Sequence, residues 1–164
     1  MTLPRFSRPL FFPALLLLSL TASAEVRLPK LWSDHGVIQR DRPIHVWGWG
    51  DVGERVTATL RSANGGADET ATATIDSLGH WSLYLLPRPA GGGAYTLTVA
   101  GSNTVTLSDL LMGDVWLASG QSNMELPLLG FPGSAVLKNG AEEIKAANHP
   151  EIRLLHEAKR FSYF

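Results

Sequence analysis

The chain of 164 residues contains no cysteine. This absence excludes a disulfide-stabilised scaffold, a Cys-x-x-Cys redox site and a zinc site with cysteine ligands. The chain has no run of Lys and Arg, which argues against binding to the phosphate backbone of a nucleic acid. Its most apolar stretch, residues 10–20, is shorter than the roughly 20 residues that a membrane-spanning helix needs. Nucleic-acid and membrane partners are therefore not expected.

The first 24 residues have the pattern of a removable secretory leader. Arg5 and Arg8 form a positive start, residues 10–20 are apolar, and residues 22–24 (ASA) fit a signal-peptidase site. We expect cleavage after Ala24, rather than retention as a signal anchor, and therefore an exported protein. Removing the two arginines leaves 12 basic against 15 acidic residues, a net charge of −3. The absence of cysteine is compatible with export, because an oxidising compartment permits disulfides without requiring them.

Residues 25–108 form the first predicted domain, an antiparallel β-sandwich. Apolar and polar side chains alternate along residues 55–61, 80–86 and 95–99, as expected for strands with one buried face. Turn signals separate these segments, at residues 51–53, 64–66, 76–79 and 91–93. Several short strands at such spacing are typical of a sandwich.

Residues 109–164 form the second predicted unit, the beginning of an α/β domain. Residues 114–118 are expected to be a strand buried on both faces, residues 136–147 a helix and residues 151–156 a second strand. Two strands and one helix cannot cover both faces of a parallel sheet. We therefore interpret the sequence as the front of a longer protein or as a truncated gene model. The predicted fold class is mixed β and α/β.

Ser122 is the best candidate for chemistry. It follows a predicted strand in a turn that contains Gly120, where the backbone can bend sharply and free N–H groups can stabilise an oxyanion. The pattern differs from the G-x-S-x-G elbow of α/β-hydrolases, because Met124 stands where the last glycine belongs. On this local pattern alone, an ordinary turn or helix-capping serine is the commoner case.

The sequence around this serine resembles a known family. Residues 113–125 read GDVWLASGQSNME, which is similar to the nucleophile block of the sialate O-acetylesterase family, carbohydrate esterases of the SGNH-hydrolase superfamily. The resemblance extends upstream to residues 31–40 (LWSDHGVIQR) and 43–48 (PIHVWG), and downstream to residues 147–154 (ANHPEIRL). It implies that residues 109–164 begin an SGNH-type α/β catalytic domain.

The resemblance also implies a mechanism. Ser122 would be the nucleophile and a backbone oxyanion donor in an acyl-enzyme route that releases acetate from an acetylated carbohydrate, without a cofactor. The family's Asp-x-x-His pair and its other oxyanion donors should lie beyond Phe164, since no Asp-x-x-His occurs in this sequence. We therefore expect the 164-residue chain alone to lack useful esterase activity. Leu126 departs from the family, where Trp is frequent, and is expected to alter the acyl side of the pocket.

Further residues carry open alternatives. Gln121 either lines the sugar pocket or faces solvent, and Asn123 either caps the helix after the turn or touches the substrate. Asp114 is expected to bind backbone N–H groups at a strand start rather than to orient a catalytic partner. The five histidines are scattered, so no metal site is expected.

The tryptophans divide into two expected roles. Trp47, Trp81 and Trp116 are expected in the core, because large aromatic residues at alternating strand positions are usually buried. Trp49, which lies between two glycines, is the best candidate for stacking against a sugar.

Two alternative functions stay open: a non-catalytic glycan-binding β-sandwich in which Ser122 is vestigial, and an acetyl-xylan esterase of the same superfamily. The sequence gives no signal of oligomeric state.

Overall fold

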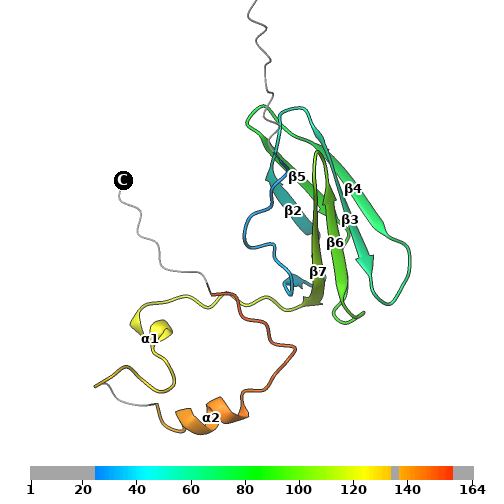
Figure 1. Ribbon diagram of the computed structural model, residues 1–164. Coiled ribbons are helices and arrows are strands. Elements are labelled where there is room, and N and C mark those ends of the chain that lie inside the picture. Colours follow the sequence, from blue (N-terminus) through cyan, green and yellow to red (C-terminus); the bar gives the residue numbers. More distant parts are fainter. Residues whose placement is uncertain (1–24, 134–136, 157–164) are drawn as a thin grey trace, which may run out of the picture.

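The computed structural model describes residues 25–133 and 137–156 (Figure 1). The described chain is mostly β, and its helices are few and short. The expected leader, residues 1–24, lies outside the described residues, as do residues 157–164. In chain order the elements are β1 Val37–Gln39, β2 Ile44–Trp49, β3 Arg55–Ser62, β4 Glu69–Thr74, β5 His80–Leu85, β6 Tyr95–Ala100, β7 Thr104–Gly113, α1 Ser122–Glu125 and α2 Gly140–Ala146.

The strands form a five-stranded sheet in the order β1-β7-β6-β3-β4 and a two-stranded sheet of β2 and β5. Neighbouring strands are antiparallel except β1 and β7, which run parallel with Val37 opposite Leu111. The expectation of a purely antiparallel arrangement is therefore wrong at this edge. The turn before β1 lies alongside β7, where the N–H of His35 donates a hydrogen bond to the Ser108 carbonyl at 3.1 Å. β1 then leaves that turn in the same direction as β7.

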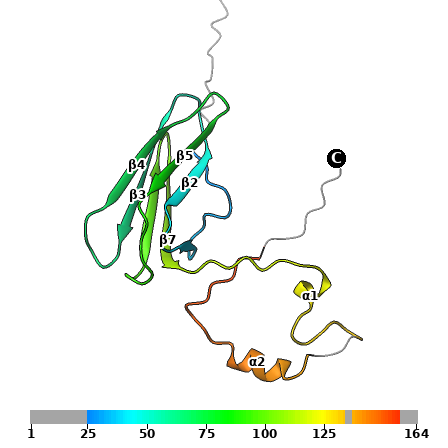
Figure 2. The same ribbon diagram turned by 180° about the vertical axis from the view of Figure 1, so that it is seen from behind.

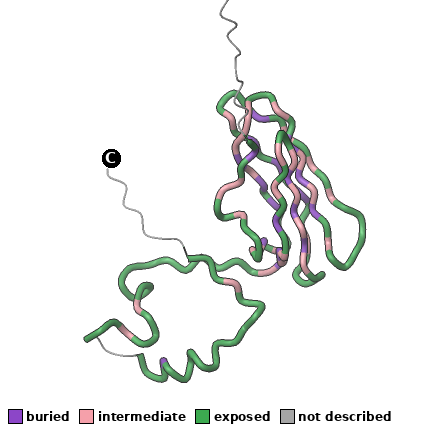
Figure 3. The backbone as a smooth tube through the Cα atoms, viewed as in Figure 1, coloured by how far each residue is buried: buried purple, intermediate pink, exposed green. Residues whose placement is uncertain are grey.

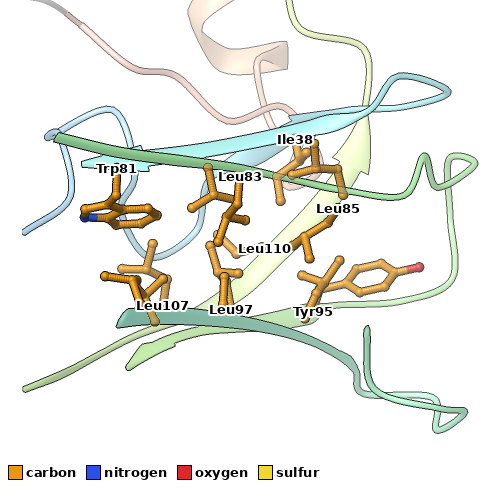
Figure 4. Close-up of a cluster of buried hydrophobic side chains, with 14 of the residues drawn as sticks. Ile38, Trp81, Leu83, Leu85, Tyr95, Leu97, Leu107 and Leu110 are labelled. Atoms are coloured by element: carbon orange, nitrogen blue, oxygen red, sulfur yellow. The ribbon is translucent and has the colours of Figure 1, made fainter. Parts of the chain in front are cut away.

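The inner faces of the two sheets share one apolar core. Alternation along each strand places every second side chain inside, as with Val56, Ala58 and Leu60 of β3. Figure 4 shows side chains of β5 pointing across the core toward those of β6 and β7. The predicted burial of alternate residues in β3, β5 and β6 is confirmed, and so is the core position of Trp81, which is 3% exposed. The four predicted turn segments each separate two consecutive strands.

Gly48 lets the chain before β1 join the two-stranded sheet. Residues Arg27 and Trp49 form an isolated antiparallel bridge through two backbone hydrogen bonds, of 2.9 and 3.0 Å. A Cβ on Gly48 would overlap the carbonyl oxygen of Arg27 and press on the ring of Trp81. A glycine is therefore required where these backbones approach each other.

The chain after Gly113 differs from the predicted α/β pattern. Residues 114–118 and 151–156 form no strand, and both stretches are almost entirely exposed (Figure 3). The expected helix over 136–147 is shorter and begins at Gly140; residue 136 lies outside the described part. The helix prediction is confirmed over Gly140–Ala146. The two strand predictions are wrong, because an apolar run becomes a buried strand only beside another strand, and the described residues offer none there.

Two of the tryptophans also lie elsewhere than expected. Trp116 is 89% exposed, because the strand that was to bury it is absent. Trp47 is only half-buried, because it lies on the outer face of β2, on the same side as Trp49. The expectation that both belong to the core is therefore wrong.

Candidate active site

The segment that carries Ser122 starts where β1 and β7 end together. Gln39 lies opposite Gly113 in the parallel pair. The N–H of Arg40 donates to the Gly113 carbonyl at 2.9 Å, and the N–H of Val115 donates to Oε1 of Gln39 at 2.9 Å. Side-chain and backbone bonds from the end of β1 therefore fix the direction in which the chain leaves the sheet.

Asp114 is held by Arg40. Nε of Arg40 donates to Oδ1 of Asp114 at 2.9 Å. This hydrogen bond, helped by the charge of Arg40, lowers the pKa of the Asp114 carboxyl, while the same contact raises the pKa of Arg40. The expected role of Asp114 at a strand start is wrong, because no strand follows it and its partner is a guanidinium. Both groups are exposed, so the pair orients the chain and adds little stability.

Ser122 is the first residue of the short helix α1. The turn closes through a hydrogen bond of 2.9 Å from the N–H of Met124 to the Gln121 carbonyl. Gly120 precedes it in close contact with Met124, because a Cβ at position 120 would lie 2.6 Å from Cγ of Met124. The side chain of Ser122 is exposed. The first N–H groups of a helix lack intrahelical acceptors, so those of Ser122 and Asn123 suit an oxyanion.

The neighbours of Ser122 are exposed as well. Gln121 is the residue before α1 and makes no side-chain cap hydrogen bond. Asn123 lies inside α1, so its expected alternative as the helix cap is wrong, and contact with a substrate stays a prediction. Leu126, the position that departs from the family, is half-buried and directly follows α1.

The described histidines whose partners are known pair elsewhere than with Ser122. His35 pairs with Asp109, His45 with Ser82 at 3.1 Å, and His80 packs edge-on against Trp49. His149 and His156 lie in exposed stretches without helix or strand. In the described ranges, no group of three or more His, Asp or Glu side chains is placed to hold a metal ion.

One cluster was missed at the level of sequence. Nδ1 of His35 lies 2.6 Å from Oδ2 of Asp109, and Nη2 of Arg153 donates to the same oxygen at 2.9 Å. Nη1 of Arg153 also donates to the Asp109 and Gly36 carbonyls. The hydrogen bonds from His35 and then Arg153 lower the pKa of Asp109. This cluster ties the chain after α2 back to β7. Figure 2 shows the two sheets and the later chain from behind.

Several known esterases are similar to this chain. No family model matches the chain. The sialate O-acetylesterases of Pongo abelii and Homo sapiens are each 36% identical over 101 residues, which covers 58% of this chain and 19% of theirs. A crystal structure of a carbohydrate acetylesterase from Xanthomonas citri is 36% identical with a TM-score of 0.64, and the match covers 77% of this chain and 26% of that one. The resemblance to sialate O-acetylesterases is confirmed.

The likeness to the carbohydrate acetylesterase extends beyond the sheets. Residues 26–113 make up only about half of the chain, so a match that covers 77% of it continues past the end of β7. The chain spans about a fifth of the length of the curated sialate O-acetylesterases that it matches. No helix in the described residues is long and apolar enough to cross a membrane.

Proposed function

We propose that this chain belongs to a carbohydrate O-acetylesterase that removes acetyl groups from sialic acid or a related glycan. The observation that supports this most strongly is the 36% identity to the Xanthomonas citri carbohydrate acetylesterase, at a TM-score of 0.64. The similarity to named sialate O-acetylesterases adds a candidate substrate class. Acetylated xylan is the competing substrate, and a comparison of the two acetylated substrates separates them.

In the proposed mechanism Ser122 is the nucleophile. Its Oγ attacks the carbonyl carbon of the acetyl ester and loses its proton to a general base. The ester C–O bond then breaks, the sugar oxygen takes a proton and leaves, and an acetyl-serine remains. Water hydrolyses this intermediate and releases acetate. The backbone N–H of Ser122, at the start of α1, would donate a hydrogen bond to the oxyanion in both steps.

The base and the acid that orients it would come from an Asp-x-x-His segment that this sequence lacks. A serine hydroxyl is a poor nucleophile without such a base, and only incomplete oxyanion stabilisation would remain. We therefore propose that the 164-residue chain has no useful esterase activity by itself, whereas a protein that also carries the motif is active.

The finer domain description belongs to the same proposal. Residues 25–108 would be a β-sandwich and residues 109–164 the beginning of an SGNH-type catalytic domain, although β7 runs on to Gly113. Residues 1–24 would be removed as a signal peptide, and the protein would act in a periplasm or outside the cell. The alternative of a purely non-catalytic module gains no support from the named relatives, which are all esterases.

The test compares Ser122 with a distant exposed serine in a protein that also carries the Asp-x-x-His motif. Ser122→Ala should reduce turnover of 4-nitrophenyl acetate by roughly 10³-fold or more, as loss of a triad nucleophile does. Ser102→Ala is the matched control, because it removes an exposed hydroxyl between β6 and β7, outside the nucleophile block, and should leave turnover within a few fold. Retained turnover in Ser122→Ala would remove this serine from the mechanism. Activity of the 164-residue chain alone would contradict the need for a distant base.

A further inference from the structure

The outer face of the β2–β5 sheet carries an unusual set of side chains. β2 turns Ile44 and Val46 into the core, so its other side chains point outward, and β5 alternates in the same way. The register pairs these outward residues across the two strands, which places them in one patch. We name this patch the aromatic face; its residues are His45, Trp47, Trp49, His80, Ser82 and Tyr84.

The rings of the aromatic face form a corner. The rings of Trp47 and Trp49 are 5.3 Å apart with an interplanar angle of 73°, and His80 stands at 76° to Trp49. A hollow of about 340 Å³ lies against these rings. A flat ligand ring can therefore stack on one indole while its edge contacts the next ring. His45 and Tyr84 stack on each other beside this corner, with centroids 4.6 Å apart.

The chemistry of the hollow selects a neutral ligand with a polar rim. The residues that line it include no Asp, Glu, Lys or Arg and no aliphatic side chain. Polar atoms border the rings, since Nε2 of His45 lies 3.1 Å from Oγ of Ser82. A pyranose ring matches this combination, because one face presents C–H groups and its edge presents hydroxyls. A protein interface would be expected to add Met and Arg to such aromatic residues, and neither lines this hollow.

We propose that the aromatic face is a binding site for a neutral saccharide chain. It is distinct from the segment of Ser122, which does not line this hollow. The site would hold a polysaccharide on the protein without taking part in ester hydrolysis. The choice of a saccharide among neutral flat ligands rests on the proposed esterase function. The expectation that some neutral flat ligand binds rests only on the arrangement of the rings.

The test measures binding to saccharides that carry no acetyl ester. Isothermal titration of the 164-residue chain with cellohexaose, xylohexaose and mannohexaose should give saturable binding to at least one of them. Trp49→Ala and Trp47→Ala should each weaken that binding by at least tenfold, because each removes one wall of the corner. His80→Ala, at an exposed rim position, should weaken it by a few fold.

Two matched variants serve as controls. Trp116→Ala also deletes an exposed indole, but outside the aromatic face, and should leave affinity unchanged. Arg27 pairs with Trp49 in the bridge without lining the hollow, so Arg27→Ala should leave affinity for a neutral chain within twofold. Thermal unfolding of every variant shows whether a loss of binding is a loss of fold. Since Trp47 and Trp49 are half-buried, His80→Ala decides the question if either of them unfolds the chain.

The proposal is overturned if none of the three saccharides binds at millimolar concentration, or if folded Trp49→Ala or His80→Ala binds with the affinity of the wild-type chain. It is also overturned if 3′-sialyllactose binds in their place and Arg27→Ala abolishes that binding, because the site would then recognise charge. These outcomes are independent of Ser122, since no acetyl ester is present. Failure of saccharide binding therefore leaves the esterase proposal standing, and failure of the esterase assay leaves saccharide binding to be judged by titration.

Discussion

The residues before and after Gly113 use their apolar side chains in opposite ways. Within the described ranges, every buried hydrophobic residue lies between Val26 and Met112. After Gly113, Gly140 is the only buried residue among those that the structure describes. Large apolar side chains there stay exposed (Figure 3); they are Val115, Trp116, Leu117, Met124, Leu128, Leu129, Phe131, Leu137, Ile144, Ile152, Leu154 and Leu155.

This difference shows what holds each region in place. The two sheets are held by burial of their own apolar faces, which is the dominant favourable contribution to folding. The later region is tied to them by polar contacts, from Gln39 and Arg40 at its start and from Arg153 near its end. Exposed apolar clusters of this kind are typical of surfaces that contact another chain or domain. The segment of Ser122 is therefore positioned by a few hydrogen bonds and not by packing.

The largest expected effect compares the substitution of one leucine in each region. Leu97 in β6 is fully buried, so Leu97→Ala should lower the free energy of unfolding by about 3 kcal/mol through lost burial and the cavity left behind. Leu154 is 93% exposed, and Leu154→Ala should change the free energy of unfolding by less than about 0.5 kcal/mol. Urea denaturation followed by circular dichroism measures both. Equal effects would mean that the later region packs against the core after all.

The same contrast explains which parts of the fold the sequence predicts. Alternation of apolar and polar residues is sufficient to predict the buried face of β3, β5 and β6, because a period of two leaves one face for the core whichever strand lies beside it. Alternation also places Trp47 on the outer face of β2. Ile44 and Val46 take the inner positions, and Trp47 lies on the same side of the strand as Trp49. The prediction that Trp47 lies in the core is wrong because it was based on the residue type and not on which face of β2 its position takes.

The later region and its ties could not be predicted in this way. An apolar run such as residues 114–118 indicates burial but not the neighbour that would supply it. The contacts of Asp109 join residues 74 and 44 positions away in the sequence, and no local pattern links such distant residues. For the candidate site, the sequence alone offered Ser122 in a tight turn. The Asp-x-x-His pair that would supply the base does not occur in the sequence, so the chemistry rests on the resemblance.

A second, smaller effect compares two crowded glycines. Gly48→Ala would force a Cβ into the Arg27 carbonyl, a backbone atom that cannot move aside, and should cost about 2 kcal/mol of unfolding free energy. Gly120→Ala meets Cγ of Met124, a flexible side chain, and should cost less than about 0.5 kcal/mol. Thermal and urea unfolding of the two variants test the difference. A large loss in Gly120→Ala would show that α1 is packed more rigidly than its exposure indicates.

The smallest expected effect concerns the tie between the two regions. Asp109→Asn removes the charge that Arg153 and His35 share, so the chain after β7 should be released more often. We expect limited chymotrypsin cleavage near the exposed Trp116 and Leu117 to become about two- to fivefold faster, in line with the weak coupling of exposed ion pairs. Asp68→Asn, which removes an ion pair with Arg61 inside the β region, is the matched control and should leave this cleavage unchanged.

The pH dependence of the same tie follows from the lowered pKa of Asp109. A carboxylate whose pKa is lowered in the folded state contributes stability at pH above its ordinary value of 3.8, and loses it as the pH falls through the lowered value. Hydrogen exchange of residues 114–156, corrected for intrinsic rates, should therefore increase below that pH in the wild-type chain and show a smaller increase in Asp109→Asn. An identical acid response in both would assign the release to other carboxylates, such as Asp114 with its own lowered pKa beside Arg40.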